Sequence, residues 1–288
     1  MTRCSVALDA LGVRVERRAG RGYRLADPID LLDASAIRAD LAPGLSLDVL
    51  DRCASTNVEL MARVAAGAPS GTALACEIQT AGRGRRGNDW VTPLGGGLAF
   101  SLAWRMPRVP AGLAGLSLAA GVACARALAR LGFDDVGLKW PNDIVHCGRK
   151  LGGILVEASG DGGRNAVVCG VGLNTRLNAR ARAGIAQPVV DLAALSPTPP
   201  TRGVLLAALL NGLAEAMETF GAHGFAAFRE AWLRHHVHQG EQVRLMLADR
   251  RVVEGRALGV ADDGALLLDH DGRIEPFHAG EVSLRRAA

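Results

Sequence analysis

The strongest constraint on the fold is one long helical pattern with strand patterns on both sides of it. Small and apolar residues recur at helical spacing from 111 to 131, and Gly132 follows where a helix cap belongs. Further helical patterns lie near 201–220 and 222–237. The strand patterns occupy 71–80, 98–104, 136–140, 151–158 and 166–173. This order predicts an α/β fold with a central sheet.

The two ends of the chain differ from this middle part. Residues 1–42 are rich in arginine and contain a short helical pattern at 5–12 and a hairpin pattern at 13–25, too little apolar surface to fold alone. From 241 to 285, short alternating runs are separated by Asp-Asp-Gly and His-Asp-Gly, which are typical of hairpin turns. We therefore predict a small N-terminal piece at 1–42, an α/β domain at 43–238 and a small all-β barrel at 239–288. We expect a loose loop at 178–200.

The composition excludes some classes of protein. Of 288 residues, 49% are hydrophobic and 22% are charged, which is ordinary for soluble folds. No window approaches the ~18 uninterrupted apolar residues of a membrane span, and the first residues lack the layout of a signal peptide. We therefore expect a cytoplasmic protein without a membrane partner. The six cysteines form no Cys-x-x-Cys pair, which disfavours a structural zinc site or a disulfide scaffold.

A glycine-arginine loop at 82–87 formally satisfies the dinucleotide-binding pattern G-x-G-x-x-G. That pattern must open a helix, whereas residues 88–93 here contain β-formers and a proline. Three arginines in the loop could instead close over a polyphosphate and stabilise developing charge: Arg83, Arg85 and Arg86. The alternative is a solvated basic turn.

Only two of the 33 basic residues are lysines, Lys139 and Lys150. Ammonium and guanidinium groups are not interchangeable in a closed site, so we infer a local reason for both, with chance as the alternative. Pro141 should end the strand that contains Lys139, which places Asn142 and Asp143 at the end of that strand. There an amide could bind an adenine edge and a carboxylate a metal or hydroxyl, although both residues also suit a simple turn.

Two adjacent glycines, Gly152 and Gly153, follow Lys150 in an apolar strand pattern. Glycine weakens a strand unless something must approach its backbone closely. We therefore predict that this strand forms a wall of a ligand slot, with the lysine at its mouth. The next glycine-rich strand ends at Asn174, so two strand-end asparagines could bind one adenine.

Taken together, five segments in this order resemble the biotin protein ligases. The segments are Ser55-Thr56-Asn57, 79–90, 139–143, 149–157 and 170–174. The resemblance runs from about Asp51 to the C-terminus, and the tail is similar to the family's SH3-like C-terminal domain. It implies an α+β mixed sheet like that of class II aminoacyl-tRNA synthetases.

The resemblance also implies a two-step reaction. Biotin and Mg-ATP give biotinyl-5'-AMP and pyrophosphate, and a lysine of the biotin carboxyl carrier protein of acetyl-CoA carboxylase then attacks the mixed anhydride. ATP, Mg²⁺ and biotin are therefore the expected small molecules, and Mg²⁺ arrives with ATP because no protein motif fixes it. The implied biotin-binding residues are Ser55, Thr56, Asn57, Gln79, Arg83, Gly84, Arg85, Lys150, Gly152 and Gly153. The implied adenylate-binding residues are Arg86, Trp90, Asn142, Asp143 and Asn174.

The resemblance makes Lys150 and Arg85 the catalytic residues. The ammonium would touch both the biotin carboxylate and the α-phosphate, two anions that are costly to bring together at low dielectric. The polar ureido head group of biotin needs fixed donors and acceptors, which Ser55, Thr56 and Gln79 can supply. The role of Lys139 is left open, and the alternative to a role in the site is that of a structural cation at the end of its strand.

The N-terminal piece departs from the bifunctional members of the family, which carry a complete winged helix-turn-helix. Residues 1–42 resemble only its last helix turn and wing, so we expect no operator-specific DNA binding. A homodimer is possible by analogy, and the residue of 178–190 that covers the adenylate stays open. A lipoate protein ligase is the nearest alternative, although its apolar tunnel would not need a polar head-group site. A biotin-sensing DNA-binding regulator is the second alternative, which the retained Lys150 and Arg85 disfavour.

Overall fold

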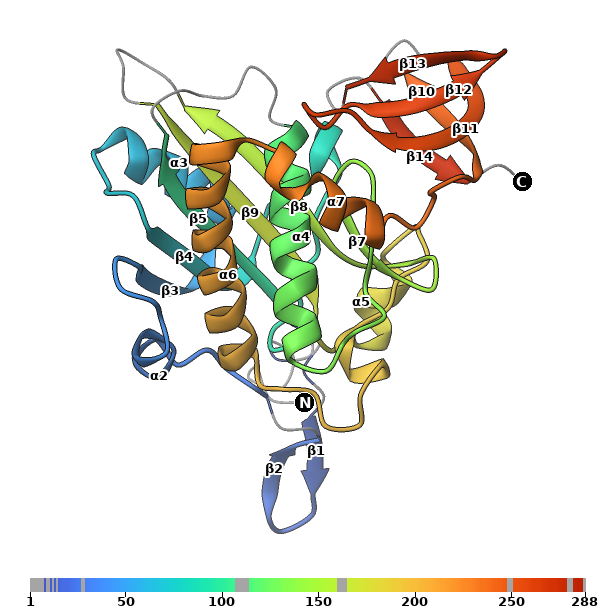
Figure 1. Cartoon of the computed structure of the whole chain (residues 1–288). Coiled ribbons are helices and arrows are strands. Elements are labelled where there is room, and N and C mark those ends of the chain that lie inside the picture. Colours follow the sequence, from blue (N-terminus) through green and yellow to red (C-terminus); the bar gives the residue numbers. More distant parts are fainter. Residues whose placement is uncertain are drawn as a thin grey trace.

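The computed structural model describes Leu8, Leu11, Val13 and residues 15–26, 29–106, 114–159, 165–247, 251–278 and 282–286. A seven-stranded sheet with helices on both faces forms the body of the molecule, and a five-stranded sheet lies at one corner of it. A two-stranded hairpin extends from the body at the N-terminal end (Figure 1). The predicted α/β fold with a small C-terminal β domain is confirmed.

The seven-stranded sheet is mixed. In spatial order its strands are β3 (Ser46–Cys53), β4 (Thr72–Gln79), β5 (Gly97–Arg105), β9 (Ala166–Asn174), β8 (Arg149–Ser159), β7 (Asp143–His146) and β6 (Gly137–Lys139). Only β3 and β4 pair in parallel, across the helix α3 (Thr56–Ala65) that connects them. All five predicted central strands are confirmed. The sequence patterns missed β3, whose exposed edge carries charged residues, and the short β7.

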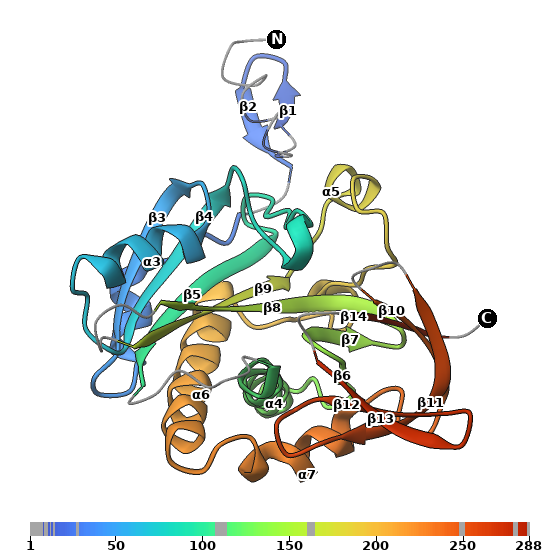
Figure 2. The same ribbon diagram turned by 90° about the horizontal axis from the view of Figure 1, so that it is seen from above.

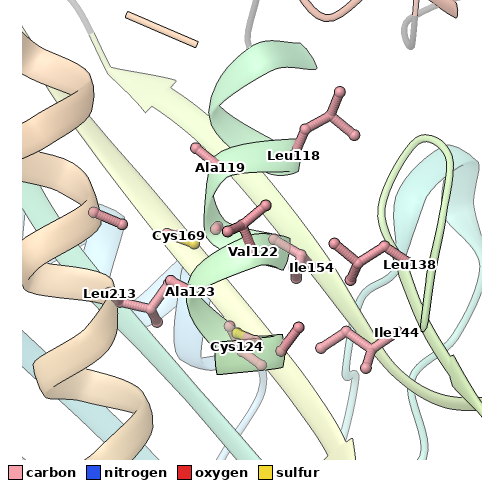
Figure 3. Close-up of a cluster of buried hydrophobic side chains, with 14 of the residues drawn as sticks. Leu118, Ala119, Val122, Ala123, Cys124, Leu138, Ile144, Ile154, Cys169 and Leu213 are labelled. Carbon is pink, nitrogen blue, oxygen red and sulfur yellow. The ribbon is translucent and has the colours of Figure 1, made fainter. Parts of the chain in front are cut away.

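Three predicted helices cover one face of this sheet, namely α4 (Ala114–Arg130), α6 (Arg202–His223) and α7 (Ala226–His235), whereas α3 lies on the other face (Figure 2). Figure 3 shows α4 packed between the sheet and α6. The side chains in this contact include Val122, Ala123, Cys124, Ile154, Cys169 and Leu213, all buried. By length and composition alone α6 could cross a membrane, and 56% of its apolar window is buried. A core helix of a soluble protein meets the same test.

The expectation of a loose loop at 178–200 is wrong. The segment contains α5 (Ala179–Ala183) and a 3-10 turn, η2 (Leu192–Ala194). Asn178 caps α5, and the buried Asp191 caps η2 while also accepting from Leu177 N and pairing with Arg182. A capping carboxylate satisfies several backbone donors at once, which is why this polar segment is ordered.

The N-terminal hairpin consists of β1 (Val15–Arg18) and β2 (Gly22–Leu25), as predicted, and nearly all of it is exposed. The helix expected at 5–12 lies mostly outside the described residues. The short helix α2 (Ala34–Ala39) contacts α6 and β3 through the buried Ile37.

A buried ion pair ties the preceding residues to the body. Arg202 Nη1 lies 2.7 Å from Glu77 Oε2 and donates to Asp30 O at 2.7 Å, while Leu32 N donates to Glu77 Oε1 at 2.6 Å. The domain boundary at residue 42 stays a prediction, and these contacts place residues 30–42 with the large sheet.

The C-terminal sheet is antiparallel throughout. Its strands, in spatial order, are β13 (Arg273–Phe277), β12 (Leu266–His270), β11 (Val252–Val260), β10 (Gln242–Leu247) and β14 (Val282–Arg286). The two predicted hairpin turns connect β11 to β12 and β12 to β13, with Gly264 and Gly272 at positive φ. Trp140 Nε1 donates to Gly264 O at 3.1 Å, so a turn of this sheet is bonded directly to the large sheet.

A histidine cluster lies where α7 leads into the C-terminal sheet. His236 is buried, its ring centroid is 4.4 Å from that of Trp232, and its Nδ1 faces Gln239 Oε1 at 3.4 Å. Burial is the main cause that lowers the pKa of His236 to about 4, with His238 adding to the effect. The ring is therefore neutral at pH 7.

This neutral histidine should make the folded state sensitive to acid. The unfolded chain takes up a proton near pH 6.5 but the folded chain only near pH 4, so stability is lost as the pH falls through that window. We expect His236 to contribute a loss of about 2 kcal/mol between pH 7.5 and pH 5. Urea unfolding of the wild type and of His236→Gln at both pH values measures it; equal pH dependence in the two proteins would contradict the assignment.

Candidate functional site

A cavity of about 640 Å³ opens on the α3 side of the large sheet. The side chains of Cys169, Val171 and Leu173 point into the apolar core with the helices, so the alternate β9 residues Gly170 and Gly172 face the cavity. A Cβ on Gly170 would lie 2.1 Å from Asn57 Oδ1, and one on Gly172 would lie 2.2 Å from the Trp90 ring. Both glycines are therefore required for neighbouring side chains to approach β9.

The glycine-arginine loop forms one wall of the cavity. It makes a single 3-10 turn, η1 (Arg85–Gly87), and then returns as extended chain, with Trp90 N donating to Gly82 O at 2.9 Å. A Cβ on Gly82 would lie 2.3 Å from Trp90 O. The loop opens no α-helix, which confirms that it is not a dinucleotide-binding fingerprint.

One end of the cavity is a buried polar pocket at the start of α3. Ser55, Thr56 and Asn57 are all buried there. Thr56 N donates to Gln79 Oε1 at 2.8 Å, and Gln79 Nε2 donates to Thr92 Oγ1 at 3.3 Å. These bonds fix the orientation of the Gln79 amide, so the pocket offers a set of donors and acceptors in defined positions.

Asn57 connects three elements beneath this pocket. Its Nδ2 donates to Glu157 Oε2 at 2.9 Å and to Leu155 O at 3.1 Å, and its Oδ1 accepts from Ser101 Oγ at 2.6 Å. The sequence analysis missed Ser101 and Glu157. A signal for Ser101 was present, because it is the one polar residue in the apolar run 98–104 and a buried hydroxyl needs partners.

The two lysines share one carboxylate. Lys150 Nζ lies 2.7 Å from Asp143 Oδ1, and Lys139 Nζ lies 4.0 Å from Asp143 Oδ2. All three side chains are mostly buried, so this pairing is screened less than a surface ion pair. Lys150 Nζ also lies 5.9 Å from the centroid of the Trp90 ring. An anion that enters the cavity can therefore replace Asp143 as the partner of a lysine.

Arg85 adds a further cation to the cavity wall. Burial, helped by the neighbouring Arg86, lowers the pKa of the Arg85 guanidinium, and Asp143 partly opposes the shift. The group remains charged at neutral pH because a free guanidinium titrates above 12. A partly buried cation at the wall of a cavity is stabilised by a bound anion.

The residues expected at the adenine make bonds within the protein. Asn142 Nδ2 donates to Ile154 O at 2.8 Å, and Asn174 Nδ2 donates to Val190 O at 3.1 Å and to Lys150 O at 3.3 Å. Trp90 Nε1 is buried without a hydrogen-bond partner among the residues that the structure describes. The two amides hold the strand ends in place, and the indole supplies an aromatic surface beside them.

The structure brings nearly all predicted site residues to one cavity. Those that line it are Ser55, Thr56, Asn57, Gln79, Arg83, Gly84, Arg85, Arg86, Trp90, Asn142, Asp143, Lys150, Gly153 and Asn174. Gly152 does not, because it lies on the other face of β8, where a Cβ would be 2.7 Å from Gly172 O and 3.4 Å from Ile144. Residues 184–187 and Val189 also line the cavity, which the sequence left open.

A mixed sheet that places a buried polar pocket beside clustered, partly buried cations suits an enzyme that binds a small acid together with a phosphate-bearing partner. That class of enzyme is the adenylate-forming ligases. Two family models match the chain: the biotin/lipoate A/B protein ligase family over residues 51–174, and the biotin protein ligase C-terminal domain over residues 238–285.

Individual relatives agree with these models. The chain is 39% identical over 277 residues to the bifunctional ligase/repressor BirA of Escherichia coli strain K12. This alignment covers 96% of the chain and 85% of the relative. The chain is 36% identical over 241 residues to a biotin–[acetyl-CoA-carboxylase] ligase of Mycobacterium tuberculosis, covering 82% and 88%. The biotin protein ligase of Aquifex aeolicus, solved with biotin and ATP, superposes with a TM-score of 0.73 at 27% identity, covering 84% and 99%. The chain belongs to the biotin/lipoate A/B protein ligase family.

A test of the cavity geometry uses the β9 glycine beneath Asn57. We expect Gly170→Ala to destabilise the protein by about 1–3 kcal/mol, because the new Cβ overlaps the Asn57 amide, which three hydrogen-bonding partners and a helix hold in place. Urea denaturation measures the change. The matched control is Gly221→Ala in α6, where no described residue lies within 4 Å of the new Cβ and stability should stay equal or rise. A neutral Gly170→Ala would show that Asn57 can move freely.

Proposed function

We propose that the chain is a biotin protein ligase. It makes biotinyl-5'-AMP and pyrophosphate from biotin and ATP, and it transfers biotin to a lysine of a carrier protein. The single observation that carries this proposal is the joint placement of Lys150 and Arg85 beside the buried polar pocket of Ser55, Thr56 and Gln79. The names and bound ligands of the relatives support the same reaction.

The substrate orientation follows from the charges along the cavity. The polar pocket binds the uncharged ureido head, whose donors and acceptors need fixed partners. The acid end of biotin then points toward Lys150, which leaves Asp143 and pairs with the incoming carboxylate. Arg85 and Lys150 together stabilise the charge that develops when the carboxylate oxygen attacks the α-phosphate and pyrophosphate leaves.

The nucleotide occupies the rest of the cavity. Trp90 covers the adenine, Asn142 and Asn174 lie at its edge, and Arg86 faces the phosphates. Mg²⁺ carried with ATP would neutralise part of the phosphate charge. The carrier lysine must reach the adenylate from the open mouth of the cavity and attack as the neutral amine, which displaces AMP.

The carrier protein of acetyl-CoA carboxylase is the proposed partner, since relatives are named as ligases for that enzyme. Homodimer formation, a cytoplasmic location and the absence of operator-specific DNA binding stay predictions. The relatives named as repressors do not decide the last of these.

Incubation of the purified chain with labelled biotin, Mg-ATP and a biotin carboxyl carrier domain tests the function. We expect label on one carrier lysine, together with biotin-dependent exchange of pyrophosphate into ATP. Unlabelled biotin should compete far better than lipoate, because the head-group pocket is polar. Efficient competition by lipoate, or biotin binding without exchange, would instead favour the lipoate ligase or a biotin-sensing regulator.

The lysine assignment makes a sharper prediction. Lys150→Arg should reduce biotin-dependent pyrophosphate exchange by about 100-fold or more, because the wide guanidinium cannot occupy the place of an ammonium 2.7 Å from Asp143. The matched control is Lys139→Arg, the same change at the other lysine, which sits 4.0 Å from the same carboxylate and should lose far less activity. Near-normal exchange in Lys150→Arg would remove Lys150 from the mechanism.

A further inference from the structure

A chain of hydrogen bonds connects the head-group pocket to the glycine-arginine loop through Glu157. Ser101 Oγ lies 2.8 Å from Thr56 Oγ1 and donates to Asn57 Oδ1 at 2.6 Å. Asn57 Nδ2 donates to Glu157 Oε2 at 2.9 Å. The other oxygen of the same carboxylate, Oε1, lies 3.4 Å from Arg83 Nη2. The chain therefore begins at a buried hydroxyl and ends on the loop.

The two ends of this chain differ in burial. Ser101, Thr56 and Asn57 are almost wholly inaccessible, whereas the Arg83 side chain is 53% exposed and that of Glu157 is 27% exposed. A carboxylate on an apolar strand such as β8 is costly to desolvate unless both oxygens have partners. Here each oxygen serves a different element, one the start of α3 and the other the loop.

We propose that Glu157 is a positioning residue for the ligase reaction: it holds Asn57 and Arg83 with one carboxylate and so keeps the glycine-arginine loop beside the head-group pocket before substrate arrives. This inference rests on the proposed function and adds a residue to it. The ion pair then lowers the cost of ordering the loop when biotin binds. Without the ion pair it samples more conformations, and binding must supply the lost order.

The proposal predicts different consequences for the two halves of the contact. Glu157→Gln keeps an oxygen that can accept from Asn57 but loses the charge that pairs with Arg83, whereas Glu157→Ala removes both partners. A half-exposed ion pair is weak, so the expected change is modest. We expect Glu157→Gln to raise the KM for biotin roughly threefold to tenfold, with a smaller effect on kcat.

Limited trypsin digestion of the ligand-free protein measures how accessible the loop is, because the arginines of the loop are cleavage sites. We expect fragments ending at Arg83, Arg85 or Arg86 to form several-fold faster in Glu157→Gln than in the wild type. Salt at 0.5 M should reduce this difference, because it screens the exposed ion pair. Mass spectrometry identifies the fragments, and calorimetric titration with biotin measures affinity independently of catalysis.

The control is Glu254→Gln, which breaks an arginine–glutamate pair on the C-terminal sheet, where Arg244 Nε lies 3.0 Å from Glu254 Oε1 and the carboxylate is more exposed than that of Glu157. It should change neither loop cleavage nor the KM for biotin. If the wild type binds biotin and Glu157→Gln behaves like this control, the positioning role is wrong while the proposed function stands. If the wild type binds no biotin, the proposed function itself fails. If the wild type binds biotin, faster loop cleavage and a raised KM in Glu157→Gln support the inference, even if Glu157→Ala fails to fold.

Discussion

The cavity depends on two positions of strand β9 that carry no side chain. The face of β9 that meets the helices is filled by apolar residues, whereas the opposite face carries Gly170 and Gly172. Any Cβ there would occupy the space of Asn57 or of the Trp90 ring. A central strand loses intrinsic stability through such glycines, so β9 relies on its long antiparallel pairing with β5 and β8 to stay in place. The packed apolar core on the helix-covered face of β9 thus permits a cavity on its opposite face.

The electrostatic arrangement follows from the same closed geometry. Asp143 is the shared partner of both lysines, and the partly buried Arg85 lines the same cavity. Asp143 lies beside two ammonium groups, so this cluster of three side chains carries a net positive charge. Anionic substrates are therefore drawn to a site that already contains its cations in position, and few charges need to be reorganised when they meet. Lysine suits this role, because a compact ammonium can exchange one partner for another over a short distance.

Much of the fold could be predicted from sequence, because periodicity reports burial directly. The helix at Ala114–Arg130 and the central strands were evident in this way, and the cavity residues followed from motifs whose order the fold preserves. The failures have physical causes. Gly152 alternates to the other face of its strand, and the segment after Asn178 is ordered by the caps of one buried carboxylate rather than by apolar spacing. Glu157 was missed because its partners lie 74 and 100 residues away in the sequence, at Arg83 and Asn57.

The bond from Trp140 Nε1 to Gly264 O has a consequence for how this architecture can be recombined. The indole sits next to the Asn142-Asp143 turn of the cavity, yet its one polar hydrogen is satisfied by the C-terminal sheet. Replacing that sheet by an unrelated β domain leaves a buried donor without an acceptor, next to residues that line the cavity. A graft between two ligases therefore has to carry the β11–β12 turn together with the tryptophan that it bonds. Trp140 and the turn that contains Gly264 therefore have to be exchanged together, and the boundary between the two sheets is not a neutral site for recombination.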